Sequence, residues 1–273
     1  MGLLSEMRQS SLARVAQAKE REPAAALRAA ILAADPPPRL RLSAGGFDVI
    51  AELKLRSPAL GNLSAQTHNP VARLEAYAEG GAAVVSVLTE PYRFDGSLDH
   101  LRMATEVLAP YRVPVMCKDF LVDPYQVLEA RANGASGVLL IIAMLTRDEL
   151  DALLDAAAQL ELFVLLEAFD AQDLSIAREI AATRAGRAEQ ILMGLNCRNL
   201  ETLAVDFERF TRLRSELPEA WPAVAESGVE STAQAAQVAR LGYRCALVGT
   251  SLMRRPDPRK AVAELVAAGR GAP

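Results

Sequence analysis

Eight short apolar runs recur along the 273 residues of this chain, at intervals of about 23 to 34 residues. Their Val, Ile and Leu residues are nearly continuous rather than alternating, which is typical of parallel strands that are buried on both faces. Amphipathic stretches separate them. Eight strands that alternate with helices predict a closed (β/α)8 barrel, also called a TIM barrel. The runs are DVIAEL (48–53), AAVVSVL (82–88), VPVMC (113–117), GVLLIIA (137–143), LFVLLE (162–167), QILMGL (190–195), PAVAE (222–226) and CALVG (245–249).

Helix signals mark the stretches between these runs. Asn69, Asp123 and Asp257 each precede a proline, so each predicts an N-cap with proline at the first helical position. Thr146 and Glu149 have the spacing of a capping box. An open, doubly wound sheet is the structural alternative, but no run is followed by the G-x-G-x-x-G fingerprint that many such folds use.

Two further amphipathic segments, 4–19 and 24–34, precede the first run and are joined to it through a Pro-Pro-Pro stretch. We expect a single barrel domain over residues 1–273, in which residues 1–45 form a helical N-terminal extension. These helices would either cap one end of the barrel or cover the active site, and their periodicity alone favours neither.

The charge balance and the Cys and His content argue against several classes of protein. With 30 basic and 34 acidic residues the net charge is −4, so the totals do not support a nucleic-acid surface. Three cysteines without paired spacing and two distant histidines predict no metal site. The first residues lack the pattern of a signal peptide, and no apolar run reaches the roughly 18 residues of a membrane span. We expect a cytoplasmic protein with neither nucleic acid nor a membrane as a partner.

Polar residues gather at the ends of the predicted strands, where barrels of this kind carry their chemistry. Taken alone, any one of them is as consistent with a solvated charge or a structural ion pair as with a functional group. Several carboxylates and lysines that converge on one mouth, however, shift each other's pKa values, as acid–base sites require. The strand-end residues are Glu52, Lys54, Ser86, Lys118, Glu167, Asn196, Glu226 with Ser227, and Gly249 with Thr250.

Only four of the 30 basic residues are lysines, and two of the four, Lys54 and Lys118, lie at strand ends. A lysine can give and take a proton when its surroundings shift its pKa, whereas arginine stays charged. The positions of these lysines therefore favour proton transfer at the barrel mouth.

A second signal follows the last two runs, where Ser227-Gly228 and Gly249-Thr250 stand. Glycine and small hydroxyl residues there let backbone N–H groups approach a phosphate, which barrels of this kind often bind at this place. Arg198, just after the sixth run, would add a bidentate contact. The chain therefore has the pattern of a phosphate site.

Phe94 and Phe120 lie in or near loops at the predicted mouth. Aromatic side chains there are suited to packing against a planar substrate ring. Packing beneath a loop is the alternative for both.

Six segments carry motifs of a known family: IAELKLRSP (50–58), SVLTEPYRFDGSL (86–98), CKDFLVDPYQVLEARANGASGVLLI (117–141), GLNCRNLETLAVD (194–206), VAESGV (224–229) and LVGTSLMRRPDP (247–258). They closely resemble indole-3-glycerol phosphate synthase, and the KDFxxDPYQ, NxRNL and AESG motifs are highly specific. The resemblance implies a (β/α)8 barrel with extra N-terminal helices.

The resemblance also implies a carboxy-lyase of tryptophan biosynthesis. Such an enzyme cyclises, decarboxylates and dehydrates 1-(2-carboxyphenylamino)-1-deoxyribulose 5-phosphate to indole-3-glycerol phosphate. No cofactor and no metal are implied, because the leaving groups are CO₂ and water and the carbonyl itself is the electron sink. The expected partner is this phosphorylated small molecule, and the chain would work as a monomer or a homodimer.

Carried over by motif, the resemblance implies that Lys118 is the general acid that protonates the substrate carbonyl and that Glu167 is an acid or base in the dehydration. Lys54 would hold the substrate carboxylate, while Glu52 and Asn196 would orient the substrate. Substrate-binding residues, including two phenylalanines on the anthranilate ring, would be Ser57, Phe94, Phe120, Arg198, Glu226, Ser227, Gly228, Gly249 and Thr250.

Three positions, Ala59, Cys197 and Phe169, depart from the commonest family pattern without removing a proposed catalytic group. Two other functions are the alternatives. One is another phosphate-binding barrel enzyme, either a sugar-phosphate isomerase or an enzyme that forms a Schiff base at Lys118. The other is a non-catalytic paralogue that binds a ligand or a partner protein. Retention of every proposed acid and base favours the synthase.

Overall fold

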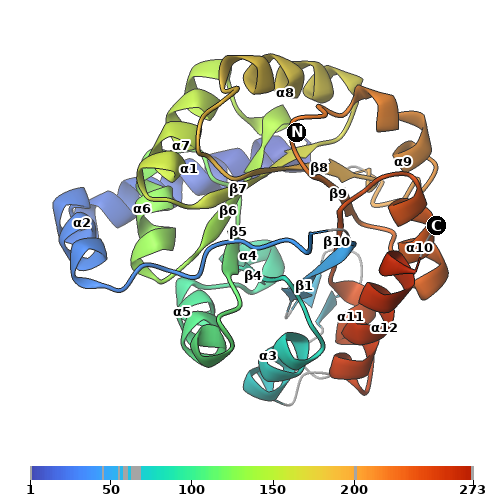
Figure 1. Ribbon diagram of the computed structural model, residues 1–273. Coiled ribbons are helices and arrows are strands. Elements are labelled where there is room, and N and C mark those ends of the chain that lie inside the picture. The colour runs from blue at the N-terminus through green and yellow to red at the C-terminus, as the bar shows by residue number, and fades with distance from the viewer. Residues whose placement is uncertain are drawn as a thin grey trace.

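Eight parallel strands close into a barrel in the order β1-β10-β9-β8-β7-β6-β5-β4, with helices around it (Figure 1). The computed structural model describes residues 2–44, 46–54, 56–57, 61–62, 69–199 and 202–271, with the backbone alone at 56–57 and 61–62. The predicted (β/α)8 barrel is confirmed, and the doubly wound alternative is wrong. The barrel strands are β1 (Asp48–Leu53), β4 (Val84–Leu88), β5 (Val115–Lys118), β6 (Gly137–Ile141), β7 (Phe163–Ala168), β8 (Ile191–Asn196), β9 (Ala223–Glu226) and β10 (Cys245–Val248), and a separate antiparallel pair is β2 (Arg56–Ser57) with β3 (Gly61–Asn62).

Side-chain caps begin the helices at the predicted places. Asn69, Asp123 and Asp257 each accept a backbone N–H from the first turn that follows, and Thr146 with Glu149 forms a capping box. Each such cap stabilises its helix by about 1 kcal/mol. The α-helices are α1 (Leu3–Arg21), α2 (Ala24–Ala33), α3 (Pro70–Glu79), α4 (Pro91–Phe94), α5 (Leu98–Leu108), α6 (Pro124–Ala132), α7 (Arg147–Gln159), α8 (Ala171–Thr183), α9 (Arg209–Arg212), α10 (Thr232–Arg240), α11 (Thr250–Met253) and α12 (Pro258–Arg270), and short 3₁₀ turns span Ala109–Tyr111, Ile142–Met144 and Arg214–Glu216.

The barrel strands bury both of their faces, which explains the nearly continuous apolar runs. Outward side chains such as Val49 and Leu166 pack in the layer between strands and helices. Inward side chains such as Ile50, Met116 and Leu165 fill the barrel itself. Because neighbours along a strand alternate between these two layers, each inward apolar residue fixes which later residue points inward at the mouth.

The N-terminal residues contact both ends of the barrel. Helix α1 lies across the carboxyl end of the strands, where Ser11 Oγ donates a hydrogen bond of 2.5 Å to the carbonyl of Phe120. The segment between α2 and β1 crosses the opposite end, where the carbonyl of Leu40 accepts from Gln190 Nε2 at 3.1 Å. In Figure 1 this segment passes in front of the barrel and α1 lies behind the strands. Of the two roles left open for the N-terminal helices, α1 therefore lies at the carboxyl end, and the opposite end is crossed by the stretch after α2 and not by a helix.

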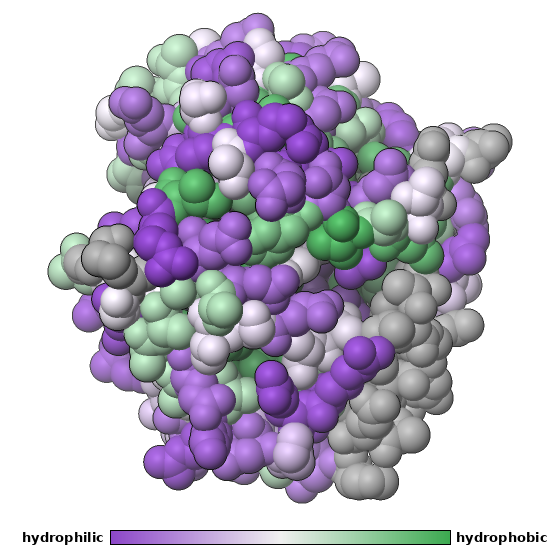
Figure 2. All heavy atoms as spheres, turned by 90° about the vertical axis from the view of Figure 1, so that its right-hand side faces the viewer, coloured by the Kyte–Doolittle hydropathy of each residue, from purple (hydrophilic) through white to green (hydrophobic). Residues whose placement is uncertain are grey.

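The face that carries α9 to α12 is mainly polar, and its apolar side chains lie in small, separate groups (Figure 2). Among the residues that the structure describes, no helix is both long and apolar enough to cross a membrane. The same residues include no group of three or more His, Cys, Asp or Glu side chains arranged to hold a metal ion.

Candidate active site

A pocket at the carboxyl ends of the strands brings together thirteen of the fourteen residues to which the resemblance assigns a role. The side chain of the fourteenth, Ser57, lies outside the described residues, as does Ala59. Ser86, also named at a strand end, is fully buried and does not line this pocket. Apolar side chains of the barrel interior, including Leu139, Ile141 and Leu247, also line the pocket. The thirteen are Glu52, Lys54, Phe94, Lys118, Phe120, Glu167, Asn196, Arg198, Glu226, Ser227, Gly228, Gly249 and Thr250.

The alternation of the strands places the charged groups in this pocket. Ile50 of β1 points into the barrel, so Glu52 and Lys54, two and four residues later, are on the same side. Met116 of β5 likewise points inward, and Lys118 follows it by two. The other strand-end residues placed by the same spacing are Glu167, Asn196 and Glu226.

Two glycines make room for two of the buried carboxylates. A Cβ atom added to Gly194 of β8 would overlap the Glu226 carboxylate, and one added to Gly249 would overlap that of Glu52. Glu226 and Glu52 are each 1% exposed. Both carboxylates therefore lie directly against a neighbouring backbone, where no other residue type would fit without a shift.

Lys118 lies among three buried carboxylates. Its Nζ is 3.4 Å from Glu167 Oε2 and 3.7 Å from Glu226 Oε2. Burial by itself lowers the pKa of Lys118, but the negative charges of Glu167, Glu226 and Glu52 outweigh it and raise that pKa above its ordinary value. Lys118 is therefore protonated in the free protein at neutral pH.

The charges around Lys118 also change the pKa of Glu226. Burial, together with the nearby Glu167 carboxylate, raises the pKa of Glu226 well above its ordinary value. Glu226 therefore gives up its proton at a higher pH than an exposed glutamate does. On the β1 side, Lys54 Nζ forms a 2.6 Å ion pair with Glu52 Oε1. Two lysine–carboxylate groups thus face one pocket from neighbouring parts of its wall.

The loops after β9 and β10 form the part of the pocket wall that continues from β1, because β10 pairs with β1. Ser227 and Gly228 have φ angles of 63° and 86°, so two successive residues are in the left-handed region. Such a conformation is rare for a non-glycine residue and is found where function requires it. Arg198 also lines the pocket, but one of its guanidinium nitrogens already donates to the carbonyl of Leu203 at 2.8 Å.

The two phenylalanines meet at the mouth. Phe94 of α4 and Phe120, which follows β5, have ring centroids 6.1 Å apart and planes inclined by 38°. Both rings line the pocket. They form a tilted aromatic wall beside Lys118.

Sequence reasoning missed Asp119, which lines the pocket beside Lys118. The only signal for it in the sequence is its place directly after a strand-end lysine. Of the departures from the family pattern, Cys197 is fully buried, and Phe169 packs partly against the barrel interior. Neither belongs to the pocket lining.

Comparisons with known proteins agree with this geometry. The family model described as indole-3-glycerol phosphate synthase matches residues 4–265. A curated indole-3-glycerol phosphate synthase of Kineococcus radiotolerans is 45% identical over 82% of this chain and 77% of its own length. That of Mycobacterium ulcerans is 42% identical over 88% and 85%.

Solved structures similar to this one share the barrel at low sequence identity. The 3-hexulose-6-phosphate synthase of Salmonella typhimurium has a TM-score of 0.61 at 10% identity, covering 81% of this chain and 98% of its own. The orotidine 5'-phosphate decarboxylase of Pyrococcus horikoshii has a TM-score of 0.59 at 13% identity, covering 82% and 99%. At this identity the likeness concerns the fold alone.

Proposed function

The chain belongs to the indole-3-glycerol phosphate synthase family, and we propose that the pocket at its barrel mouth carries out that reaction with the residues described above. The substrate, 1-(2-carboxyphenylamino)-1-deoxyribulose 5-phosphate, closes a new carbon–carbon bond and loses CO₂ and then water. The observation that carries the proposal is the position of Lys118 between the carboxylates of Glu167 and Glu226.

Lys118 acts as the general acid of ring closure. The ring carbon that bears the carboxylate attacks the ketone carbon, and the electron pair of the carbonyl moves onto its oxygen. The Lys118 ammonium donates a hydrogen bond to that oxygen and then its proton. A lysine that is held protonated by buried carboxylates is charged at the start of this step, as the step requires.

Lys54 and the two phenylalanines hold the other half of the substrate. The Lys54 ammonium binds the substrate carboxylate, and the 2.6 Å contact with Glu52 fixes the direction of that ammonium. Phe94 and Phe120 contact the anthranilate ring. Loss of CO₂ then returns the bonding electrons to the ring and restores its aromaticity.

Glu167 acts as the acid or base of the final dehydration. The hydroxyl formed in the first step must leave as water while a proton is lost from the neighbouring carbon. Glu167 lies 3.4 Å from Lys118, so it can take that proton close to where Lys118 acted and pass it to the departing hydroxyl, which then leaves as water. Asn196 orients the substrate beside it, and Glu226 binds a substrate hydroxyl.

The phosphate end binds at the loops after β9 and β10. The backbone N–H groups of Ser227, Gly228, Gly249 and Thr250 surround it, and Arg198 adds a side-chain contact. The expected part of Ser57 in substrate binding concerns a side chain outside the described residues. On this proposal the phosphate lies on one side of β1, next to β10, while the ring contacts at Phe94 and Phe120 follow β4 and β5 on its other side.

Incubation of the purified protein with the substrate, followed by indole fluorescence, tests this function. Formation of indole-3-glycerol phosphate without any added cofactor or metal is the expected result. An enzyme that binds the substrate but releases no CO₂ would contradict it. Trapping of a covalent adduct at Lys118 by borohydride would favour a Schiff-base enzyme instead.

We also propose that the enzyme folds as one barrel domain over residues 1–273 and works in the cytoplasm as a monomer or a homodimer. Phosphorylated metabolites are retained inside the cell, which supports the location. A net charge of −4 is consistent with a small-molecule partner rather than nucleic acid. Light scattering on the purified protein measures the oligomeric state.

A further inference from the structure

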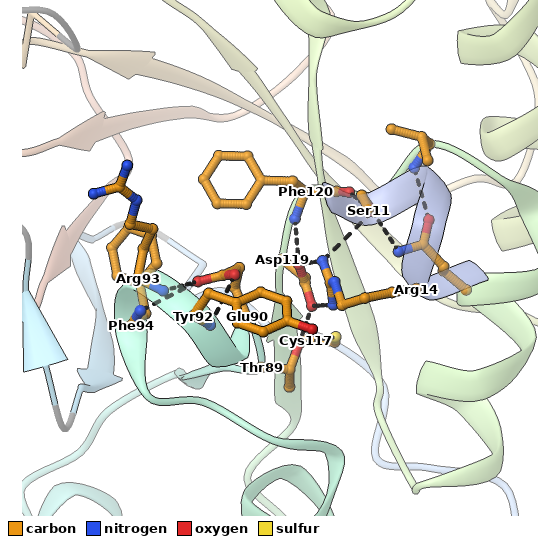
Figure 3. Close-up of polar contacts among 12 residues, drawn as sticks. Ser11, Arg14, Thr89, Glu90, Tyr92, Arg93, Phe94, Cys117, Asp119 and Phe120 are labelled. Carbon is orange, nitrogen blue, oxygen red and sulfur yellow. Dashed lines mark hydrogen bonds and ion pairs between the residues drawn. The ribbon is translucent and has the colours of Figure 1, made fainter. Parts of the chain in front are cut away.

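Asp119, the residue after Lys118, is a buried carboxylate with no part in the proposed chemistry. Its side chain is 5% exposed. Arg14 of α1 donates to its two oxygens at 2.7 and 2.9 Å, Thr89 Oγ1 donates at 2.9 Å, and the N–H of Phe120 donates at 2.7 Å (Figure 3). A carboxylate accepts about four hydrogen bonds. Asp119 is therefore saturated by the protein and has no acceptor position left for a substrate.

The bonds of Asp119 fix the main chain of Phe120 on one side, and Ser11 fixes it on the other. The N–H of Phe120 donates to Asp119, and its carbonyl accepts from Ser11 Oγ at 2.5 Å. Ser11 in turn accepts from Gln126 Nε2 at 2.9 Å. Since both polar groups of the Phe120 backbone are held by side chains, its Cα–Cβ bond keeps one direction although the residue lies outside any helix or strand. The ring itself packs against the apolar side chains of the barrel interior.

A second buried carboxylate fixes Phe94 in the same manner. Glu90 is 1% exposed and accepts from the N–H groups of Tyr92, Arg93 and Phe94 at 2.7 to 3.2 Å. It closes the single turn of α4 and so determines where Phe94 points. Glu90 directly follows Thr89, which bonds to Asp119, so the supports of the two rings are joined at the end of β4.

We propose that Asp119, held by Arg14 and Thr89, is a positioning residue that fixes the Phe94–Phe120 wall against the aromatic ring of the substrate. This inference rests on the proposed function, because it takes those two rings as the contact of the anthranilate group. Displacement of a substrate-holding group by about 1 Å costs up to about 10²-fold in rate. Asp119 acts through Phe120 and not on the reacting atoms.

Helix α1 supplies a matched control. Arg8 makes a two-pronged contact with Glu149 at 2.6 and 3.1 Å, on the same helix as Arg14. Glu149 belongs to α7 and no hydrogen bond joins it to Phe120 among the described residues. Arg14→Met and Arg8→Met each remove a two-pronged ion pair of α1, and Arg8→Met also removes a hydrogen bond to the carbonyl of Met144. Only Arg14→Met removes a partner of the residue that holds Phe120.

The probe is a substrate analogue whose ketone is reduced to an alcohol, which keeps the ring and the phosphate but cannot cyclise. We expect Asp119→Asn and Arg14→Met to weaken its binding by about tenfold, the scale of one aromatic contact. Arg14→Lys, which keeps the charge and one donor, should recover part of the affinity. Arg8→Met should bind the analogue as the unmodified protein does, and all variants should bind inorganic phosphate equally.

Equal weakening in Arg8→Met would show that general docking of α1 is responsible, and unchanged affinity in Arg14→Met would show that the rings need no support. Either result overturns the inference. An unmodified protein that does not convert the substrate would instead contradict the proposed function. Thermal unfolding checks each variant, and the three arginine variants decide the question if Asp119→Asn does not fold.

Discussion

The ammonium nitrogen of Lys118 lies 3.4 Å from a carboxylate oxygen of Glu167, which stands 49 residues later in the chain. Two strands that are not neighbours in the barrel, β5 and β7, thus supply an acid and its partner to one pocket. A buried pair of this kind leaves an uncompensated charge when one member is removed. A substitution that tests a role at the mouth therefore has to keep the shape or the charge of the residue it replaces.

Lys118→Arg should reduce turnover by about 10²-fold or more, because arginine keeps the charge but does not release a proton near neutral pH. Steady-state kinetics with the natural substrate measures the effect. Lys260→Arg, at a lysine whose side chain is 71% exposed, is the control and should leave turnover unchanged. Near-normal turnover in Lys118→Arg would mean that the acid is another group.

Gly228→Ala should weaken substrate binding, because a Cβ there would meet Val205 at 2.8 Å and shift the proposed phosphate loop. Its φ of 86° also strains any side chain, at a cost of about 1 kcal/mol in stability. Gly81→Ala has nearly the same φ, 88°, with nothing within 4 Å, so it measures that strain alone. Equal substrate affinity in the two variants would place the phosphate elsewhere.

Glu167→Gln and Glu52→Gln should stall the reaction at different steps. Glu167→Gln keeps its shape but exchanges no proton, so it should still release CO₂ and accumulate a hydroxylated intermediate before dehydration. Glu52→Gln should slow the earlier steps as well, because Lys54 loses its ion pair. Rapid-quench measurement of CO₂ against indole product separates the two. Release of both products in step and at the unmodified rate in Glu167→Gln would disprove its assigned role.

Stability should fall as the pH rises through about 7, owing in part to Glu129 of α6. Burial raises the pKa of Glu129 from 4.5 to about 7. Because the folded state holds this proton more tightly than the unfolded chain, the contribution is fully present below pH 4.5 and is lost as the pH rises through 7.

Glu129→Gln stays neutral, so it should be less sensitive than the unmodified protein to a change from about pH 5 to about pH 8. The free energy of unfolding in urea at the two pH values measures this. Glu106→Gln, at an exposed position of α5, provides the control. An identical pH dependence in all three proteins would show that Glu129 does not carry the effect.

The barrel and most of the pocket could be predicted from the sequence because both depend on local spacing. Apolar runs locate the strands, and the two-residue period that carries Ile50 to Glu52 and Lys54 locates the charged groups. The support of the aromatic wall could not be predicted in this way. Arg14 and Asp119 form their ion pair although they are 105 residues apart in the sequence, and no sequence pattern near either residue indicates the pairing.

The path of the N-terminal residues escaped prediction for the same reason. An amphipathic helix shows that one face is buried, but it does not show against what. The contact of Leu40 with Gln190 joins residues 150 apart in the chain. Only the closed barrel brings such partners together.

The placement of these first residues has a consequence for the order in which the molecule is made. On the ribosome α1 and β1 are made before the other barrel strands, yet β1 pairs with β10, and Asp48 of β1 lies opposite Cys245 of β10. The carbonyl of Ser43 likewise accepts a hydrogen bond from Arg244, which follows 201 residues later in the chain. Contacts at such separations form slowly, since long loops must close first. Until β10 has left the ribosome, the barrel cannot close, and Lys118 and Glu167 lie at most in an open sheet. We therefore expect catalytic activity to appear only in one late step, when β10 pairs with β1.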